Sequence, residues 1–257
     1  MEKNSNVDIF IVTHKSFDCK KTDPVYKILC SEDEDVKSDT VPVIKVPRVL
    51  ANDGWSELSK IYEIYKDPYT YELKDWVGIN HYHRYFNFED VNGNVPDISK
   101  VMDGHMCLIT PLIITDSMRI QYGICHNIND FNSCVEVAKR LYPEWSERID
   151  IVADAPYLIA SNIVLMRYHD FLDMFGFVFN VLLTWCKEMG INPESDEDFH
   201  KRVEDNRQEY LTKYKSWEET LHEQARIPAF LSERLMTIWI IMHSTPGHLL
   251  YADLVEE

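Results

Sequence analysis

Short uninterrupted apolar runs recur along the chain, and this is the pattern of strands that are buried on both faces. Residues 7–13 (VDIFIVT) and 76–79 (WVGI) form two of these runs, rich in the β-branched and aromatic residues that favour strands. Gly78 lies inside the second run, where the missing side chain lets a neighbouring backbone or a ligand approach closely. Continuous apolar strands are typical of parallel sheets covered by helices. Further strands are expected over residues 41–46, 106–110 and 157–166.

Apolar residues at helical spacing predict the layers that cover such a sheet. Trp55, Leu58 and Ile61 recur every three to four residues, which predicts a helix over residues 54–67 with Asp53 as its N-cap. The other expected segments are helices over residues 130–141, 171–187 and 229–243, a solvated helix or lid over residues 192–224, and a loop around residues 121–126.

Polar residues follow two of the apolar runs directly and are the first candidates for a binding site. They are Thr13, His14 and Lys15 after the first run, and Asn80, His81, Tyr82, His83, Arg84 and Tyr85 after the second. Ligands of open α/β sheets bind at the carboxyl ends of strands, arginine fits phosphate oxygens, and histidine can bind a metal or move a proton. We therefore expect an anion such as a nucleotide here. The alternative is structural: a solvated turn after the first run, and a cluster that pairs with carboxylates such as Glu89 and Asp90 after the second.

Three polar positions in apolar surroundings give a second set of candidates. Asn162 interrupts the strand expected over residues 157–166, and a buried polar group must find a partner or face a ligand. Glu233 and Arg234 stand in the apolar last helix, where they are either a structural ion pair or part of a site. Glu57 lies at the margin of an apolar helix face, as a surface carboxylate or a group turned towards the crevice.

Composition narrows the class of protein. The chain has 257 residues, of which 45% are hydrophobic, and a formal net charge of -17, which argues against nucleic-acid binding because such proteins present basic surfaces. Six cysteines without a CxxC pair and no apolar leader after Met1 indicate a cytoplasmic protein with reduced thiols. The apolar runs are shorter than a membrane span requires, and peripheral association at the inner face of the plasma membrane stays open.

Sequence motifs exclude several common site types. GxGxxG, GxxxxGK[ST], HExxH and GxSxG are all absent, so the usual dinucleotide, P-loop, zincin and hydrolase signatures are missing. Two Asp-x-Asp matches, residues 33–35 and 196–198, lie in hydrophilic acidic runs. They are interpreted as chance matches, and no metal ligands are assigned.

Several segments together resemble a bacterial family found in capsule and O-antigen gene clusters, long described as a domain of unknown function. They are IFIVTHK, the SEL of WSELSKIY, VGINHYHRYF, QYGICHNINDF and FLSERL, and the likeness covers roughly residues 7 to 243. The third is similar to the family signature His-Tyr-Arg-Arg-Tyr-Phe. Members are regarded as GT-A-like glycosyltransferases, some linked to galactofuranosyl transfer. The resemblance implies an α/β fold with a mixed, mainly parallel sheet flanked by helices, and a helical C-terminal part.

The resemblance also implies partners and an organisation of the site. The donor would be a nucleoside diphosphate sugar, such as UDP-galactofuranose or another UDP-hexose, and the acceptor a saccharide or lipid-linked glycan. Residues 1–257 would form one domain, with about 1–115 binding the donor and about 116–257 facing the acceptor. The expected donor-binding residues are Thr13, His14, Lys15, Asn80, His81, Tyr82, His83, Arg84, Tyr85, Asn162 and Arg234.

Two departures from the family pattern bear on activity. His83 replaces the first of the paired arginines, which removes a permanent charge, and the Asp- and Asn-rich stretch before the first helix is shortened to VLANDGW. Asn52 and Asp53 are its possible remnant.

The expected reaction is glycosyl transfer during capsule, O-antigen or exopolysaccharide synthesis, with or without Mn²⁺ or Mg²⁺. Glu233 is the first candidate for the base that takes the acceptor proton, and Glu57 is the second. The alternatives are a degenerate module that binds a glycan or nucleotide sugar without turnover, and a purely structural partner in an assembly complex.

Overall fold

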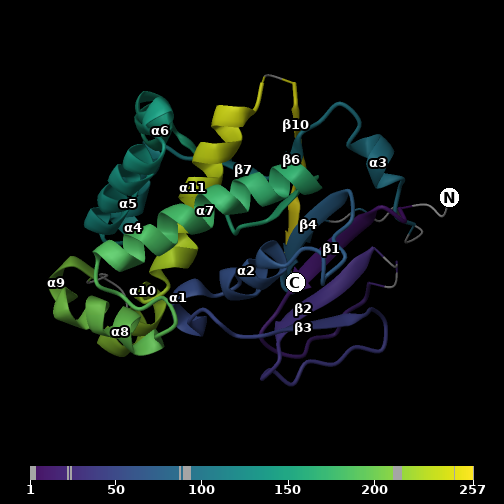
Figure 1. Cartoon of the computed structure of the whole chain (residues 1–257), viewed down its shortest axis with the longest axis horizontal. Helices are drawn as coiled ribbons and strands as arrows, with labels where there is room; N and C mark the ends of the chain where they lie inside the picture. Colours follow the sequence, from purple (N-terminus) through teal and green to yellow (C-terminus); the bar gives the residue numbers. More distant parts are fainter. Residues whose placement is uncertain are drawn as a thin grey trace.

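A mixed β-sheet forms the centre of the protein, and most of the helices gather on one side of the molecule (Figure 1). The computed structural model describes residues 4–21, 23, 25–86, 88, 94–210, 216–245 and 247–256. Within these residues nine strands share one sheet, with the order β10-β6-β9-β4-β1-β2-β3 and with β5 linking β4 to β11. These strands are β1 (Val7–Val12), β2 (Tyr26–Ser31), β3 (Val43–Val46), β4 (Trp76–His81), β5 (Arg84–Phe86), β6 (Cys107–Ile109), β9 (Val164–Arg167), β10 (Leu249–Tyr251) and β11 (Leu254–Glu256). A separate hairpin pairs β7 (Pro111–Ile113) with β8 (Tyr157–Ile159).

The direction of the strands brings the candidate residues to one edge of the sheet. β1 lies between β2 and β4 and runs parallel to both, while β9 runs antiparallel to β4 and β6. Val12 is in register with His81, so the carboxyl ends of β1 and β4 lie side by side. On the far side of the turn that follows β4, β11 pairs antiparallel with β5, with Val255 opposite Tyr85.

Both faces of the sheet are buried, as its apolar runs predict. Along β1, Phe10 and Val12 belong to the core on one face, whereas Ile9 and Ile11 belong to the core on the other, because successive strand side chains point to opposite faces. Gly78 is fully enclosed: a Cβ there would lie 3.2 Å from side-chain atoms of Ile9 and Leu165. Its missing side chain therefore leaves room for the Ile9 and Leu165 side chains of the neighbouring strands.

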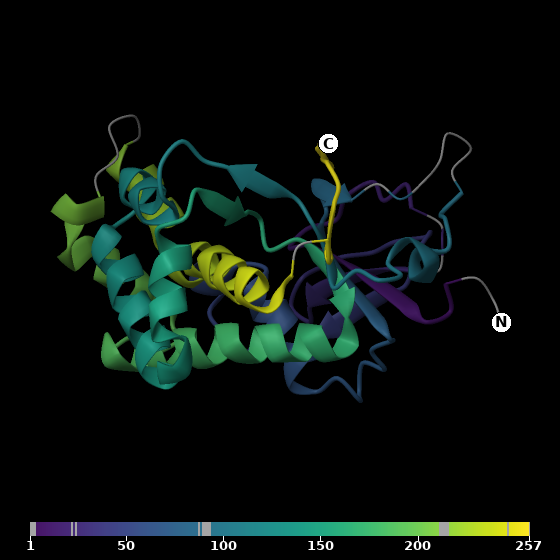
Figure 2. The same ribbon diagram turned by 90° about the horizontal axis from the view of Figure 1, so that it is seen from above.

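Two long helices join the sheet to the helical part of the molecule. α7 (Tyr168–Glu188) packs against α11 (Ile227–His243), and the two lie together in both views (Figures 1 and 2). The remaining helices are α1 (Asn52–Trp55), α2 (Leu58–Lys66), α3 (Ile98–Val101), α4 (Met118–Cys125), α5 (Ile128–Leu141), α6 (Ser146–Ala153), α8 (Asp196–Asp205), α9 (Arg207–Tyr210) and α10 (Trp217–Gln224), with a 3₁₀ turn at Pro143–Trp145. No helix within the described residues is both long and apolar enough to cross a bilayer.

Most of the expected elements are confirmed. The strands expected over residues 7–13, 76–79 and 106–110 correspond to β1, β4 and β6, and the helices over 130–141, 171–187 and 229–243 to α5, α7 and α11. The polar stretch 192–224 is helical in α8, α9 and α10, and residues 211–215 within it lie outside the described part.

Two strand predictions were inaccurate, and β2 was not predicted. The strand expected over residues 157–166 is two strands, because Ser161 and Asn162 adopt positive φ angles of 69° and 51° and turn the chain between β8 and β9. The strand expected over residues 41–46 begins at Val43, since Pro42 has no amide hydrogen to donate to a ladder.

One helix prediction, its N-cap and one loop prediction also require correction. The helix over residues 54–67 is split into α1 and α2 at Ser56, whose φ is 49°. Asp53 is therefore not an N-cap but lies in the first turn of α1, which follows Ala51. The loop around residues 121–126 is mostly helix α4, because Ser117 caps it by accepting a hydrogen bond from the Ile120 amide.

Candidate active site

A cavity of about 470 Å³ opens at the carboxyl ends of β1 and β4. The α1–α2 segment forms a second wall, and α10 and the residue before α11 form a third. Its lining residues are Val12, Thr13, His14, Asn52, Asp53, Ser56, Glu57, Lys60, His81, Tyr82, His83, His222 and Arg226. The position matches the crevice in which open α/β sheets bind ligands.

His81, the last residue of β4, offers a buried hydrogen-bonding atom to this cavity. Its Nε2 atom has no hydrogen-bond partner among the described residues and lies 3.9 Å from Glu57 Oε1. Burial lowers the pKa of His81, an effect that the Glu57 carboxylate opposes. A neutral imidazole at this position can donate a hydrogen bond to a ligand or accept one from it.

The Glu57 carboxylate is held in place from two sides. Its Oε1 atom accepts a hydrogen bond of 2.7 Å from Asn162 Nδ2, and its Oε2 atom lies 3.9 Å from Arg226 Nη2. Asn162 is fixed in turn, because Ser232 Oγ donates to its Oδ1 at 2.8 Å. The side chain of Glu57 is only 12% exposed, so this carboxylate faces the cavity and not bulk water.

Two permanent cations line the same cavity as this carboxylate. Lys60 is buried, with its Nζ atom 3.0 Å from Glu34 Oε1 and 3.5 Å from Asn52 Oδ1. Arg226 donates from Nε to Ser56 Oγ at 2.8 Å. Because Lys60 of α2 and Arg226 before α11 both line the cavity, it combines carboxylates with fixed positive charge.

The residues that follow β1 line the outer part of the same cavity. His14 is exposed and packs edge-on against Tyr82, with ring centroids 5.5 Å apart. Burial of part of the ring, together with Lys60 and Lys15, lowers the pKa of His14. The Lys15 ammonium lies over the Tyr82 ring, 5.2 Å from its centroid, and Lys15 does not line the cavity.

A smaller cavity of about 180 Å³ shares the His81 and Tyr82 wall. Tyr85 and Asn80 line it together with Lys20, Lys21 and other residues of the chain after β1. The Asn80 Oδ1 atom accepts a hydrogen bond from the Phe86 amide at 3.1 Å. The polar cluster after β4 therefore faces two adjoining spaces.

Glu233 belongs to a separate network behind the cavity. Its Oε1 atom accepts from the Ser161 amide and its Oε2 atom from Arg234 Nη1, both at 2.6 Å. Arg234 also donates to Gln121 Oε1 at 2.8 Å, and burial raises the pKa of Glu233. Arg84 joins the network by donating to Ser161 Oγ at 2.6 Å.

The structure thus divides the residues expected from the sequence into three groups. Thr13, His14, Glu57, His81, Tyr82 and His83 line the larger cavity, whereas Asn80 and Tyr85 line only the smaller one. Lys15, Arg84, Asn162, Glu233 and Arg234 line neither, although Asn162 contacts Glu57 directly. Glu89 and Asp90, the carboxylates considered as partners of the polar cluster, lie outside the described residues.

Sequence reasoning did not identify several lining residues. Lys60 follows Glu57 by three residues, a spacing that places both on one helix face, and this signal was available. His222 and Arg226 lie in no motif and reach the cavity only through the fold, whereas Ser56 stands in the SEL segment beside Glu57.

The two Asp-x-Asp matches do not line the cavity. Asp35 is an exposed residue paired with Lys37, whereas Asp196 Oδ1 accepts from the Asp53 amide at 2.7 Å and Asp198 takes part in the cap of α8.

Comparison with known proteins adds a family and a fold. A protein-family model described as "Domain of unknown function (DUF4422)" matches residues 8–216. No curated protein sequence matches the chain. Among solved structures, the chain is similar to one described as "WbbM bifunctional glycosytransferase apo structure", with a TM-score of 0.64 and 22% sequence identity.

This similarity covers 98% of the present chain but only 45% of that protein. At this identity it supports the fold alone. The expected GT-A-like architecture, a mixed and mainly parallel sheet flanked by helices, is confirmed.

Proposed function

The chain belongs to the DUF4422 family, and from this membership and the chemistry of the larger cavity we propose that it is a glycosyltransferase. The donor would be a nucleoside diphosphate sugar and the acceptor a saccharide hydroxyl. One observation carries the proposal: the Glu57 carboxylate shares one cavity with the cations Lys60 and Arg226 and with the buried His81 imidazole.

Each of these groups has a role in the proposed reaction. The bond between the sugar and the diphosphate breaks as the acceptor oxygen attacks the anomeric carbon, and negative charge develops on the leaving diphosphate. Lys60, Arg226 and the His81 N–H would stabilise that charge, since preorganised donors are most effective where charge develops. In an inverting reaction Glu57 takes the proton of the acceptor hydroxyl.

The arrangement favours Glu57 over Glu233 as the base. Glu57 lines the cavity, whereas both oxygens of Glu233 accept hydrogen bonds within the protein. We therefore assign Glu233 a positioning role, because it holds the turn at Ser161 that precedes Asn162.

We keep the division of the chain into a donor-binding half and an acceptor-binding half, with one change: two residues of the second half also bind the donor. Residues 1–115 supply most of the donor wall, and His222 and Arg226 from the second half complete it. The smaller cavity, with Tyr82 and Tyr85 in its wall, would hold the base of the nucleotide, because aromatic rings stack on nucleobases.

The biological setting is proposed from the resemblance of the signature segments. Transfer of a hexose, with UDP-galactofuranose among the candidate donors, would serve capsule, O-antigen or exopolysaccharide synthesis in the bacterial cytoplasm, at the inner face of the plasma membrane. The structurally similar protein WbbM is described as a bifunctional glycosyltransferase, which supports this class of reaction.

The test compares Glu57→Gln with Glu233→Gln. Purified protein is incubated with a panel of UDP-hexoses and simple glycoside acceptors, and products and released UDP are measured. We expect Glu57→Gln to lower kcat by about 10²-fold or more while UDP affinity stays within a factor of a few. Glu233→Gln should retain much more activity.

The opposite ranking of the two variants would reassign the base to Glu233. If wild-type protein binds UDP-sugars but neither transfers nor hydrolyses them, the chain is a binding module without turnover.

A further inference from the structure

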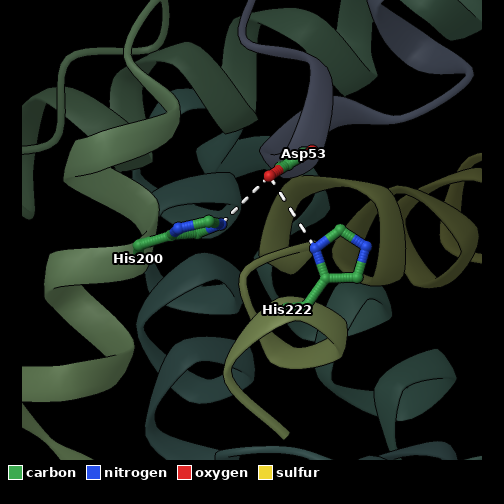
Figure 3. A group of neighbouring side chains, drawn as sticks. All are labelled: Asp53, His200 and His222. Carbon is green, nitrogen blue, oxygen red and sulfur yellow. Dashed lines mark ion pairs between the residues drawn. The ribbon is translucent and has the colours of Figure 1, made fainter. Parts of the chain in front are cut away.

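Three side chains with metal-ligand chemistry meet at the rim of the larger cavity (Figure 3). Asp53 comes from α1, His200 from α8 and His222 from α10. Asp53 Oδ2 lies 3.0 Å from His200 Nε2 and 3.8 Å from His222 Nδ1, and the three ligand atoms all lie within 4.8 Å of one another. Residues far apart in the sequence are thus brought to one point.

The packing between α1 and α8 fixes two of the three residues. A Cβ on Gly54 would lie 2.5 Å from the Phe199 ring, so the glycine lets the two helices touch where Asp53 and His200 adjoin. The Asp53 amide donates to Asp196 Oδ1 at 2.7 Å, and Trp55 Nε1 donates to the Pro193 carbonyl at 2.9 Å. The Asp53 and His200 side chains are therefore presented by a rigid contact.

The spacing of the ligand atoms is close to that around a metal ion. The Nε2 atom of His200 is buried and makes no hydrogen bond of acceptable geometry within the described residues, although it lies beside Asp53 Oδ2. Ligands about 2.0–2.1 Å from a tetrahedral ion lie roughly 3.4 Å apart, a spacing close to the two contacts of Asp53. Small side-chain rotations would bring the imidazole of His222, which is 72% exposed, into place.

The kind of ligand selects the kind of metal. Two imidazole nitrogens with one carboxylate suit Zn²⁺, Mn²⁺ and related transition ions, whereas Mg²⁺ prefers oxygen ligands alone. Three protein ligands leave at least one coordination position open to solvent or substrate. Asp53 and His222 both line the larger cavity, so the open position faces it.

We propose that Asp53, His200 and His222 form a site for one divalent transition-metal ion at the rim of this cavity. Its role towards substrate rests on the proposed function: the bound ion would hold the diphosphate oxygens of the donor. The site differs from both Asp-x-Asp matches and uses a residue of the shortened stretch VLANDGW.

Metal binding is measured first, without any donor or acceptor. Full-length protein stripped with EDTA is titrated with Zn²⁺ against a chromophoric chelator, and Mn²⁺ binding is followed by electron paramagnetic resonance. We expect one Zn²⁺ per chain in wild-type protein. Affinity should fall by at least about tenfold in each of Asp53→Ala, His200→Ala and His222→Ala.

His248→Ala provides the matched control, because His248 is an exposed histidine near β10 whose ring contacts Thr245. It should bind Zn²⁺ as wild-type protein does. Circular dichroism and thermal unfolding confirm that each variant is folded, and the exposure of His222 makes His222→Ala the variant least able to disturb the fold. The proposal is overturned if wild-type protein shows no saturable Zn²⁺ binding, or if the three site variants bind as tightly as His248→Ala.

The role towards donor is tested separately with UDP as the probe. Zn²⁺ or Mn²⁺ should tighten UDP binding to wild-type protein by calorimetry and should not do so in His222→Ala. UDP affinity that is indifferent to metal in wild-type protein overturns this role. A protein that binds the metal but transfers no sugar would refute the proposed function and leave the metal site standing.

Discussion

Burial lowers the pKa of two histidines that line the larger cavity and of one that lies outside it. For His81, His14 and His126, burial is the largest cause that lowers the pKa. These rings are therefore neutral near pH 7 and act through hydrogen bonds. The permanent positive charges of the cavity wall are instead those of Lys60 and Arg226, which stand with the carboxylates of Asp53 and Glu57.

His126 gives this effect a measurable consequence for stability. Its Nδ1 atom contacts Gln224 Oε1 at 3.0 Å, its ring stacks on Phe230, and burial together with Arg234 lowers its pKa from 6.5 to about 3. The unfolded chain binds a proton below pH 6.5 and the folded chain does not, so stability is lost as the pH falls from 6.5 towards 3.

We expect acidification from pH 7 to about 4.5 to remove less stability from His126→Asn than from wild-type protein, by on the order of 2 kcal/mol after allowance for partial exposure. Urea unfolding of both proteins at the two pH values measures the difference. Equal losses in the two proteins would show that His126 does not titrate in this way.

The sequence predicts those site residues that stand at the ends of apolar strands. Thr13, His14 and the histidines 81 and 83 follow apolar strands, and parallel topology alone brings those ends together. His222 and Arg226 carry no such signal, since their positions depend on how α10 and α11 pack far along the chain. As the candidate base, Glu233 ranks first from the sequence and Glu57 ranks first from the geometry. The sequence does not show that the Glu233 carboxylate accepts a hydrogen bond from the Ser161 amide.

At the scale of elements, the break between α1 and α2 shapes the cavity. Ser56, at a φ of 49°, separates the two helices and accepts a hydrogen bond from Arg226. Strain of this kind often accompanies functional sites. The sequence predicted one continuous helix here because the apolar residues keep their helical spacing across the break. Only the backbone conformation shows that the helix is interrupted.

A substitution at Gly54 tests whether the close contact between α1 and α8 is needed for stability. Gly54→Ala would place a methyl group 2.5 Å from Phe199, and such overpacking should destabilise the protein by about 1–3 kcal/mol. Thermal or urea unfolding measures the change.

Gly176→Ala is the control, because its Cβ would meet only Tyr65, at 3.4 Å or more. This substitution within α7 should be neutral or stabilising by up to about 1 kcal/mol. Equal effects of the two substitutions would show that the α1–α8 contact can yield without loss.

A common physical reason explains why β2 and α4 were not predicted from the sequence. β2 includes the charged residue Lys27, whose Nζ atom lies 2.7 Å from Asp8 Oδ1 of β1, so this charge is compensated by the neighbouring strand. α4 has an apolar face that packs on α5 but carries exposed Ile120 and Ile124, which obscures its period. In both cases a tertiary contact decides the structure.

At the scale of the whole molecule, the larger cavity holds two permanent cations within an acidic protein. The formal net charge is -17, yet fixed cations line the larger cavity, and a local cluster can bind an anion against an unfavourable overall charge. Binding of a nucleotide sugar to the folded state alone must stabilise the protein.

A UDP-sugar at about 100 times its Kd should add roughly 2.7 kcal/mol, which corresponds to a rise in Tm of about 5–10 °C for a chain of this size. Differential scanning fluorimetry with a panel of nucleotide sugars measures the shift. Arg226→Gln should reduce it while leaving the unliganded Tm nearly unchanged, since Arg226 is 40% exposed. A Tm that no nucleotide sugar moves would contradict the donor assignment.

β5, which lies in the signature segment VGINHYHRYF, pairs with β11, a strand that is translated much later. Val255 is opposite Tyr85 and follows it by some 170 residues in the sequence. A ribosome adding about 5–20 residues per second needs roughly 10–30 s to cover that interval. During synthesis the strand beside the candidate active site therefore waits with an open edge, the kind of edge that invites pairing with another chain, until β11 emerges to cover it.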